Sequence, residues 1–286
     1  MRRIFGLLVV VALVGLGYYF RTDVAALIAG SSPDVVAETS ATPTPGCLAL
    51  TTEPEPENLH IGVVIDPTAS TASSFTKNVI SALAAQISLP DKPRSPQDGV
   101  ATINALNLRI KQVGSNPYAY GALDTYLQIP GVQGLPPRPG VECMDSGTYQ
   151  QWVQWERTWS TQYDAAILAV ETATKSLTTM KLDDGSSGIR AALSALAAAM
   201  PGGEHTAYLV ASDFEENVKP QTAGTLAGRP LILIAACPSG DAATCTSQVE
   251  AFGTWAVNSL DAPTPEVFRP ENMTTAIAQV FRGAES

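Results

Sequence analysis

Short apolar runs alternate with longer amphipathic stretches along most of the chain. Residues 59–65, 206–211 and 231–236 are apolar and rich in β-branched side chains, which is typical of strands buried on both faces. Residues 105–113 alternate between apolar and polar positions and predict a strand nearer an edge of the sheet. Residues 266–268 predict a short last strand.

Between these runs, apolar residues recur at steps of three and four, which predicts helices packed against a sheet. The predicted helices cover residues 70–88, 148–179, 189–200, 246–260 and 274–281. Strands that alternate with helices in this way are typical of an α/β protein. The pattern therefore predicts a doubly wound, mostly parallel sheet flanked by helices.

The predicted helix at residues 148–179 carries a stripe of large aromatic side chains. Trp152, Trp155, Trp159 and Tyr163 are separated by steps of three and four, so they share one face. Such a stripe can serve as a platform for sugars or nucleobases. The interpretation we favour is structural, in which the helix buries its large side chains.

The first 57 residues differ in character from the rest. Residues 4–20 form an unbroken apolar run that follows two arginines and ends in three aromatic residues. This predicts a transmembrane helix over residues 1–21, a signal anchor rather than a cleaved signal peptide that would leave the protein secreted. Residues 22–57 are rich in Pro, Ser, Thr and Glu and predict an extracytoplasmic linker. The folded domain is expected at residues 58–286, with an irregular insertion at residues 114–147.

Export makes disulfide bonds possible, and the chain has four cysteines. Cys237 and Cys245 bracket a turn-rich loop, which favours a local bridge and leaves Cys47 to pair with Cys143. A zinc site is the alternative use of four cysteines. The chain has no Cys-x-x-Cys spacing, so the sequence favours the disulfides.

The charge of the chain limits the classes of partner. Acidic residues outnumber basic ones by 27 to 17, and the formal net charge is −10 at pH 7. A surface of this sign repels phosphate groups, which argues against nucleic acid as a partner and against adhesion to anionic lipid headgroups. We therefore expect contact with the membrane only through the N-terminal helix.

Oxygen-bearing side chains gather where three of the predicted elements begin or end. Asp66, Thr68 and Ser70 follow the first buried strand, Asp213 ends the strand at residues 206–211, and a polar turn containing Ser187 precedes a helix. Ligands of open α/β sheets bind just outside the carboxyl ends of the strands. Hard oxygen ligands suit Mg²⁺, Mn²⁺ or Ca²⁺. The alternative is purely structural, an aspartate at a strand end with Ser and Thr capping the next helix.

The first of these loops resembles a motif of von Willebrand factor A (vWA) domains, and the resemblance extends over about residues 59–281. The metal-ion-dependent adhesion site of that family contains a D-x-S-x-S loop. Asp66-x-Thr68-x-Ser70 is similar to it, with Thr in place of the middle Ser, so the hydroxyl is retained.

The other two loops resemble the remaining parts of that site. Ser187 stands in G-S-S-G-I-R-A-A-L, which is similar to the family pattern G-x-T-x-I-x-x-A-L with Ser in place of Thr. Asp213 corresponds to the aspartate of the family's strand-ending T-D-G motif, and Phe214 stands in place of the glycine.

The resemblance implies a fold and a mode of binding. The fold would be the Rossmann-like vWA fold, and a divalent cation, Mg²⁺ before Mn²⁺ or Ca²⁺, would be held directly by Thr68, Ser70 and Ser187. Asp66 and Asp213 would accept hydrogen bonds from water molecules on the cation. A Glu or Asp carboxylate of a protein partner would take an open position. The implied function is a membrane-tethered extracytoplasmic protein-binding module rather than an enzyme.

Two alternatives to this function stay open. One is a metal-free vWA-like scaffold for a cell-surface complex. The other is a phosphotransferase-like hydrolase similar to the haloacid dehalogenases, which would use Asp66, but Thr68 stands where their second aspartate supplies the general acid. Serine hydrolysis needs a histidine near the nucleophile, and His60 and His205 both flank the amino ends of predicted strands.

Overall fold

The computed structural model describes residues 47, 50–67, 73–93, 96–113, 124–144, 147–181, 188–201, 203, 205–216, 223–237 and 242–285. The predicted transmembrane helix at residues 1–21 and most of the predicted linker lie outside these residues. The same holds for Thr68, Ser70 and Ser187 of the predicted metal site. Within the part of the chain that is described, no helix combines the length and the apolar character needed to cross a membrane.

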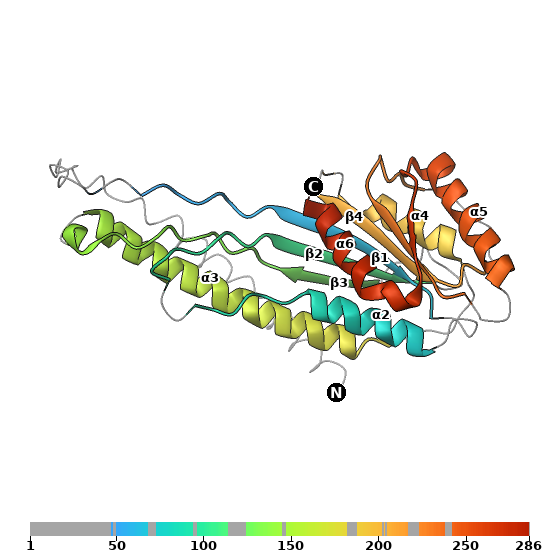
Figure 1. Ribbon diagram of the computed structural model, residues 1–286, viewed down its shortest axis with the longest axis horizontal. Coiled ribbons are helices and arrows are strands. Elements are labelled where there is room, and N and C mark those ends of the chain that lie inside the picture. Colours follow the sequence, from blue (N-terminus) through green and yellow to red (C-terminus); the bar gives the residue numbers. More distant parts are fainter. Residues whose placement is uncertain are drawn as a thin grey trace, which may run out of the picture. The chain divides into compact units, whose positions relative to one another are not determined.

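A six-stranded mixed sheet forms the centre of the fold (Figure 1). Its strands are β1 (Asn58–Ile65), β2 (Ala105–Gln112), β3 (Asp124–Ile129), β4 (Thr206–Ser212), β5 (Leu231–Ala235) and β6 (Glu266–Phe268). The order across the sheet is β3-β2-β1-β4-β5-β6, and all neighbours are parallel except β2 and β3. The predicted α/β class with a mostly parallel sheet is therefore confirmed. β1 and β4 lie side by side at the point where the strand order reverses, the usual location of ligand sites in such sheets.

Helices cover both faces of this sheet (Figure 1). They are α2 (Ser73–Gln86), α3 (Gly147–Thr178), α4 (Ile189–Ala199), α5 (Ala242–Leu260) and α6 (Met273–Glu285), with two short 3₁₀ turns, η1 (Val141–Cys143) and η2 (Pro270–Asn272). The helices α2, α6 and the C-terminal half of α3 pack on one face, and α4 and α5 pack on the other. The side chains of β1 alternate between these faces, so that Val63 and Ile65 join the first core while Val64 joins the second.

The N-terminal half of α3 packs against extended segments instead of the sheet (Figure 1). We call this part the arm and define it by residues 50–57, 96–104, 130–140 and 147–166. Its segments are joined by antiparallel bridges from Val100 to Leu135 and from Ile103 to Val132. The arm has an apolar core of its own, which includes the buried Trp152, Trp159 and Tyr163 together with Val132 and Leu135. The structural interpretation of the aromatic stripe thus holds for Trp152 and Trp159, whereas Trp155 is only partly buried.

The segment at residues 114–147, which the sequence predicts to be an irregular insertion, contains some regular structure. Residues Asp124–Ile129 form β3, which pairs with β2 and takes the edge position, so β2 lies one strand inside the sheet. Residues 132–135 then pair with residues 100–103 of the arm. Only Leu127 and Ile129 of β3 are buried, so this short edge strand has a weak apolar signal.

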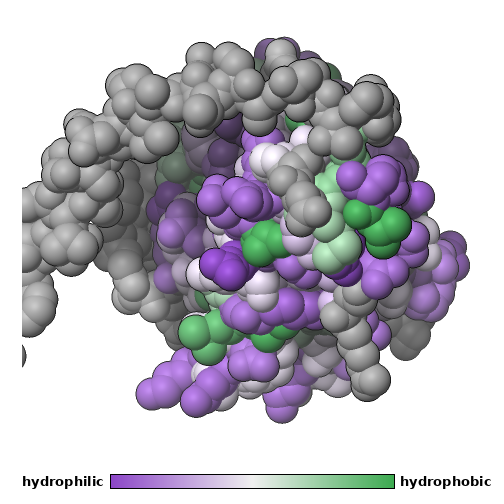
Figure 2. Space-filling view, turned by 90° about the vertical axis from the view of Figure 1, so that its left-hand side faces the viewer, coloured by the Kyte–Doolittle hydropathy of each residue, from purple (hydrophilic) through white to green (hydrophobic). Residues whose placement is uncertain are grey.

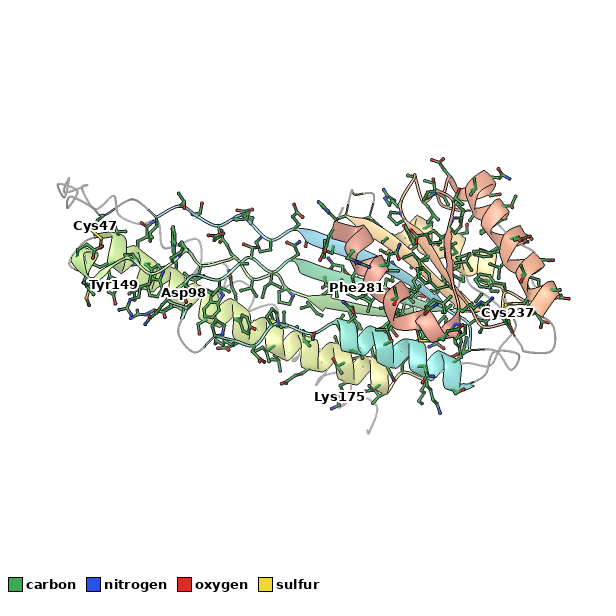
Figure 3. The ribbon with its side chains drawn as sticks, viewed as in Figure 1. Cys47, Asp98, Tyr149, Lys175, Cys237 and Phe281 are labelled. Carbon is green, nitrogen blue, oxygen red and sulfur yellow. A yellow bond between two sulfur atoms is a disulfide. The ribbon has the colours of Figure 1, made fainter. Side chains whose placement is uncertain are left out.

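Both predicted disulfide bonds are present. Cys47–Cys143 joins the N-terminal part of the chain to η1 at one end of the arm, and Cys237–Cys245 joins the end of β5 to α5 (Figure 3). Seen toward the end that carries η1, the surface is mostly hydrophilic with separate apolar side chains between the polar ones (Figure 2). The exposed apolar residues of η1 and the adjoining turn are Val141 and Met144.

Candidate metal centre

The two predicted aspartates lie at neighbouring strand ends. Asp66 directly follows β1 and Asp213 directly follows β4, and the register pairs Ile65 with Ala211. The Asp66 backbone N–H donates a hydrogen bond of 3.0 Å to the Ala211 carbonyl oxygen, which extends the ladder by one residue. The parallel sheet therefore brings both residues to the edge at which the carboxyl ends of its strands lie.

Asp66 is fully buried and held in place by hydroxyl groups. The Ser212 hydroxyl donates to its Oδ2 at 2.7 Å, and the Thr76 hydroxyl of α2 donates to its backbone carbonyl oxygen at 3.3 Å. Ser212 also accepts a hydrogen bond of 2.9 Å from the Phe214 backbone N–H. Sequence reasoning gave Ser212 no role, and a hydroxyl directly before the strand-ending aspartate is the signal that could have found it.

Asp213 is almost as deeply buried, with 1% of its surface exposed. Its Oδ1 accepts a hydrogen bond of 3.0 Å from the Glu215 backbone N–H. Its Oδ2 is buried and has no hydrogen-bond partner among the residues that the structure describes. A buried carboxylate oxygen without a donor is costly, so this atom is the clearest indication that something further binds here.

Phe214 stands where the vWA motif that this loop resembles has glycine. Its φ angle is 64°, in the left-handed region that favours glycine, which is the residue of the family's T-D-G motif. The Phe214 ring is buried and lies edge-on to Phe252 of α5, with 5.0 Å between the ring centroids. We infer that this packing offsets the cost of the backbone conformation.

The start of α4 is bound to the same edge. The Arg190 backbone N–H donates to Oε1 of Glu216 at 2.9 Å, and the Arg190 Nε lies 3.2 Å from Oε2 of the same carboxylate. Glu216 thus binds a backbone N–H at the helix N-terminus, where negative charge is favourable. The guanidinium also lies over the Trp255 ring, 5.6 Å from its centroid.

The Glu216 carboxylate is therefore occupied by Arg190 at the start of α4 and is not free to bind a cation at the predicted site. Burial raises the pKa of its carboxyl group, while the hydrogen bond and the charge of Arg190 act in the opposite direction. Its neighbour Glu215 is exposed. Of the two acidic residues beside the predicted site, only Glu215 remains at the surface to influence an approaching cation.

Replacing Glu216 by alanine is expected to lower the free energy of unfolding by about 1–3 kcal/mol, because Arg190 loses its carboxylate partner and α4 loses its cap. Urea unfolding of the wild type and the variant measures this difference. Glu215→Ala is the matched control, since it removes the same charge from an exposed position and should change stability by less than about 0.5 kcal/mol. Equal losses in the two variants would contradict the capping role.

The described residues at this end of the sheet supply two carboxylates but no complete set of metal ligands. Among the residues that the structure describes, no group of three or more histidine, cysteine or acidic side chains is placed to hold a metal ion. The edge offers two buried carboxylates, at Asp66 and Asp213. Direct ligands would have to come from Thr68, Ser70 and Ser187, which lie outside the described residues.

The two histidines lie at the other end of the sheet. The His60 backbone N–H donates to the His205 carbonyl oxygen at 2.8 Å, near the amino ends of β1 and β4. The pKa of His60 is lowered, first by burial and then by the nearby His205. Neither histidine is therefore placed to act as a base beside Asp66 or Asp213.

Comparisons with known proteins give similarity in structure only. No protein-family model matches the chain, and no curated protein matches its sequence. Solved structures with some similarity include proximal thread matrix protein 1 from the mussel byssus, at 11% identity and a TM-score of 0.37, covering 82% of this chain and 49% of that one. They also include the pilus adhesin SpaC from Lactobacillus rhamnosus GG in its open conformation, at 9% identity and a TM-score of 0.40, covering 82% and 31%. The chain spans about half the length of the first protein and about a third of the second.

Proposed function

We propose that the chain is an extracytoplasmic protein-binding module that uses a divalent cation at the edge where β1 and β4 end. The observation that carries this proposal is the buried Oδ2 of Asp213, which has no hydrogen-bond partner in the described part of the chain. It belongs to one of two buried carboxylates at adjacent strand ends. A hydrated cation would neutralise both charges and supply the missing donor.

The role of each residue is the one that the resemblance to vWA domains implies. Asp66 and Asp213 would hold water molecules of the cation, and the hydroxyls of Thr68, Ser70 and Ser187 would be its direct ligands. Neutral direct ligands leave the cation with residual positive charge. A Glu or Asp carboxylate of a protein partner is the group that such a cation would bind, and Mg²⁺ is the first candidate for the ion.

The proposed location is the outer face of a membrane. Residues 1–21 would form the anchor and residues 22–57 the linker to the folded domain. The two disulfide bonds support this location, because such bonds persist in oxidising compartments outside the cytoplasm.

A metal-free scaffold is the second candidate, and one contact favours it. The Ser212 hydroxyl already donates to Asp66 at 2.7 Å, so one of the two carboxylates is partly satisfied by the protein itself. In that case the fold would present a surface to its partners without a cation.

Titration calorimetry with Mg²⁺, Mn²⁺ and Ca²⁺ separates the two candidates. The full chain in detergent micelles, with both disulfides intact, is expected to bind one cation, and Asp66→Ala is expected to lose at least about 100-fold in affinity, because a buried charge at the site disappears. Glu215→Ala, at an exposed position beside the site, is the control and should bind the cation nearly as the wild type does.

Two results would count against the cation. Absence of saturable binding in the wild type would favour the metal-free scaffold. Equal affinity in the wild type and in Asp66→Ala would place any cation elsewhere. Circular dichroism of Asp66→Ala shows whether the variant is folded, and Asp66→Asn, which keeps the volume of the side chain, tests the same charge with less disturbance of the core.

A further inference from the structure

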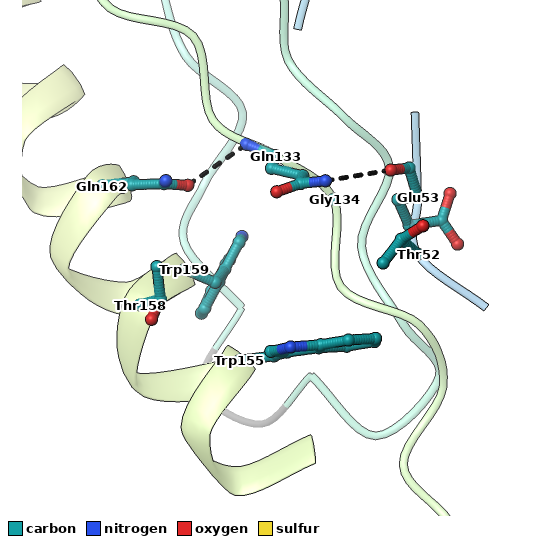
Figure 4. Close-up of a pocket in the computed structure, with 8 residues that line it drawn as sticks. All are labelled: Thr52, Glu53, Gln133, Gly134, Trp155, Thr158, Trp159 and Gln162. Atoms are coloured by element: carbon teal, nitrogen blue, oxygen red, sulfur yellow. Dashed lines mark hydrogen bonds between the residues drawn. The ribbon is translucent and has the colours of Figure 1, made fainter. Parts of the chain in front are cut away.

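A cavity of about 80 Å³ opens in the arm, between α3 and two of the extended segments (Figure 4). Trp155 and Trp159 of α3 line one side, and Gln133 and Glu53 line the other. This volume is enough for several water molecules or for part of a small ring. None of its lining residues belongs to the candidate metal centre, so the cavity needs its own explanation.

Trp159 presents an unpaired donor next to this cavity. The residue is 4% exposed, and its indole N–H has no hydrogen-bond partner among the described residues. Trp152, two turns earlier on the same helix, donates its indole N–H to the Pro136 carbonyl oxygen at 2.9 Å. Buried tryptophan N–H groups normally find such an acceptor, so the Trp159 N–H suits an acceptor on a bound molecule.

The polar side chains around the cavity are fixed in place. The Gln133 backbone N–H donates to Oε1 of Gln162 at 3.3 Å, and the Gln133 Nε2 donates to the Glu53 carbonyl oxygen at 3.0 Å (Figure 4). These bonds orient both amides while leaving the Gln133 Oε1 as an acceptor and the Gln162 Nε2 as a donor. The cavity thus offers donors and acceptors that are already positioned, beside a partly exposed indole ring.

Charges of both signs lie near the cavity and favour a neutral ligand over an ionic one. Lys92 lies over the Trp159 ring, with Nζ 5.8 Å from the ring centroid, and pairs with Asp164 at 2.6 Å. A cationic ligand such as an ammonium ion could not accept a hydrogen bond from the Trp159 N–H. Glu53 is the charged residue in the lining, so an anion would be repelled.

We propose that this cavity binds one edge of a neutral sugar residue, with the rest of the ring outside it. The apolar face of the sugar ring packs on the Trp155 indole, and a hydroxyl oxygen accepts the Trp159 N–H. Another hydroxyl donates to the Gln133 Oε1. A sugar is the neutral ligand that combines an apolar face with several hydroxyls able both to donate and to accept. The arm would then be a carbohydrate-contacting part of the protein, independent of any cation at the sheet edge.

The test uses the full chain in detergent micelles with EDTA present, so its result does not depend on the proposed cation. The probes are glucose, galactose, mannose, N-acetylglucosamine and cellobiose, and binding is followed by tryptophan fluorescence and saturation-transfer NMR. We expect saturable binding of at least one probe. A maltoside-free detergent is required, because maltoside headgroups are themselves sugars.

Three substitutions locate the bound sugar. Trp155→Ala removes the stacking ring and Gln162→Ala removes an amide donor, and each is expected to weaken binding at least about tenfold. Trp159→Phe keeps an apolar ring but removes the N–H, and it should weaken binding while the protein stays folded. Gln151→Ala, at an exposed position of α3 outside the cavity, should bind like the wild type.

Each of three outcomes would overturn the proposal. The first is that no probe binds up to about 50 mM, a concentration at which even a weak sugar site would fill. The second is that binding is unchanged in both Trp155→Ala and Gln162→Ala, which would place the sugar elsewhere. The third is that choline or glucuronate binds more tightly than every neutral sugar, which would contradict the preference for a neutral ligand.

Discussion

Replacing Cys47 and Cys143 together by serine is expected to lower the free energy of unfolding by about 4 kcal/mol, because their disulfide closes a loop with a sequence separation of 96. A crosslink over so long a loop removes much conformational freedom from the unfolded chain. The bridge also fixes the N-terminal part of the chain to η1, at one end of the arm. Denaturant unfolding of the oxidised wild type and the double variant measures the difference.

The other disulfide provides the matched control. Cys237 and Cys245 have a sequence separation of only 8, so the same loss of two sulfurs should cost about 2 kcal/mol less there. Hydrogen exchange adds a local readout, since the amides of the arm bridges at Val100 and Leu135 should lose protection only in the first variant. Equal losses in stability for the two pairs would show that loop length does not set the effect.

The strands and helices of the central fold follow from local sequence patterns. The apolar runs at β1, β4 and β5 are continuous, and a run of that kind is buried on both faces wherever it pairs. The predicted helix at residues 148–179 and the observed α3 (Gly147–Thr178) differ by one residue at each end. Local periodicity was sufficient there because no glycine or proline interrupts the pattern.

The arm could not be predicted because its order comes from contacts between distant segments. Its glycines read as signs of irregular structure, but at Gly134 a side chain would come within 2.6 Å of the Val100 carbonyl oxygen. Glycine is needed there because two backbones approach closely. The edge strand β3 was missed because its apolar pattern is weak. Tyr126 is 56% exposed, and only Leu127 and Ile129 are buried.

Only part of the candidate site could likewise be predicted from local sequence patterns. Asp66 and Asp213 could be placed together because the carboxyl ends of parallel strands meet at one edge of the sheet. The pairing of Arg190 with Glu216 spans 26 residues and depends on where α4 docks, so no local pattern indicates it. The hydroxyls of Thr68, Ser70 and Ser187 stay predictions from the motif.

Asp213→Asn is expected to be more stable than the wild type without a cation and less stable than the wild type when a cation is bound. Without a cation, the wild type keeps a buried carboxylate whose Oδ2 has no partner in the described part of the chain. The asparagine variant removes that charge and keeps the Oδ1 acceptor for the Glu215 N–H, so in EDTA it should be more stable than the wild type by about 1 kcal/mol. Thermal or urea unfolding in EDTA measures this first half of the prediction.

Saturating Mg²⁺ should stabilise the wild type but not Asp213→Asn. At about 100 times its dissociation constant, a cation that binds only the folded state adds about 2.7 kcal/mol, whereas the variant should gain nothing. Glu215→Gln, which removes a charge at the adjacent exposed position, should match the wild type in EDTA and gain the same stability from Mg²⁺. If Asp213→Asn is less stable than the wild type in EDTA and Mg²⁺ leaves that difference unchanged, the Asp213 carboxylate is a structural group of the β4 turn. A reversal of the order would instead show that its buried charge is retained for a bound cation.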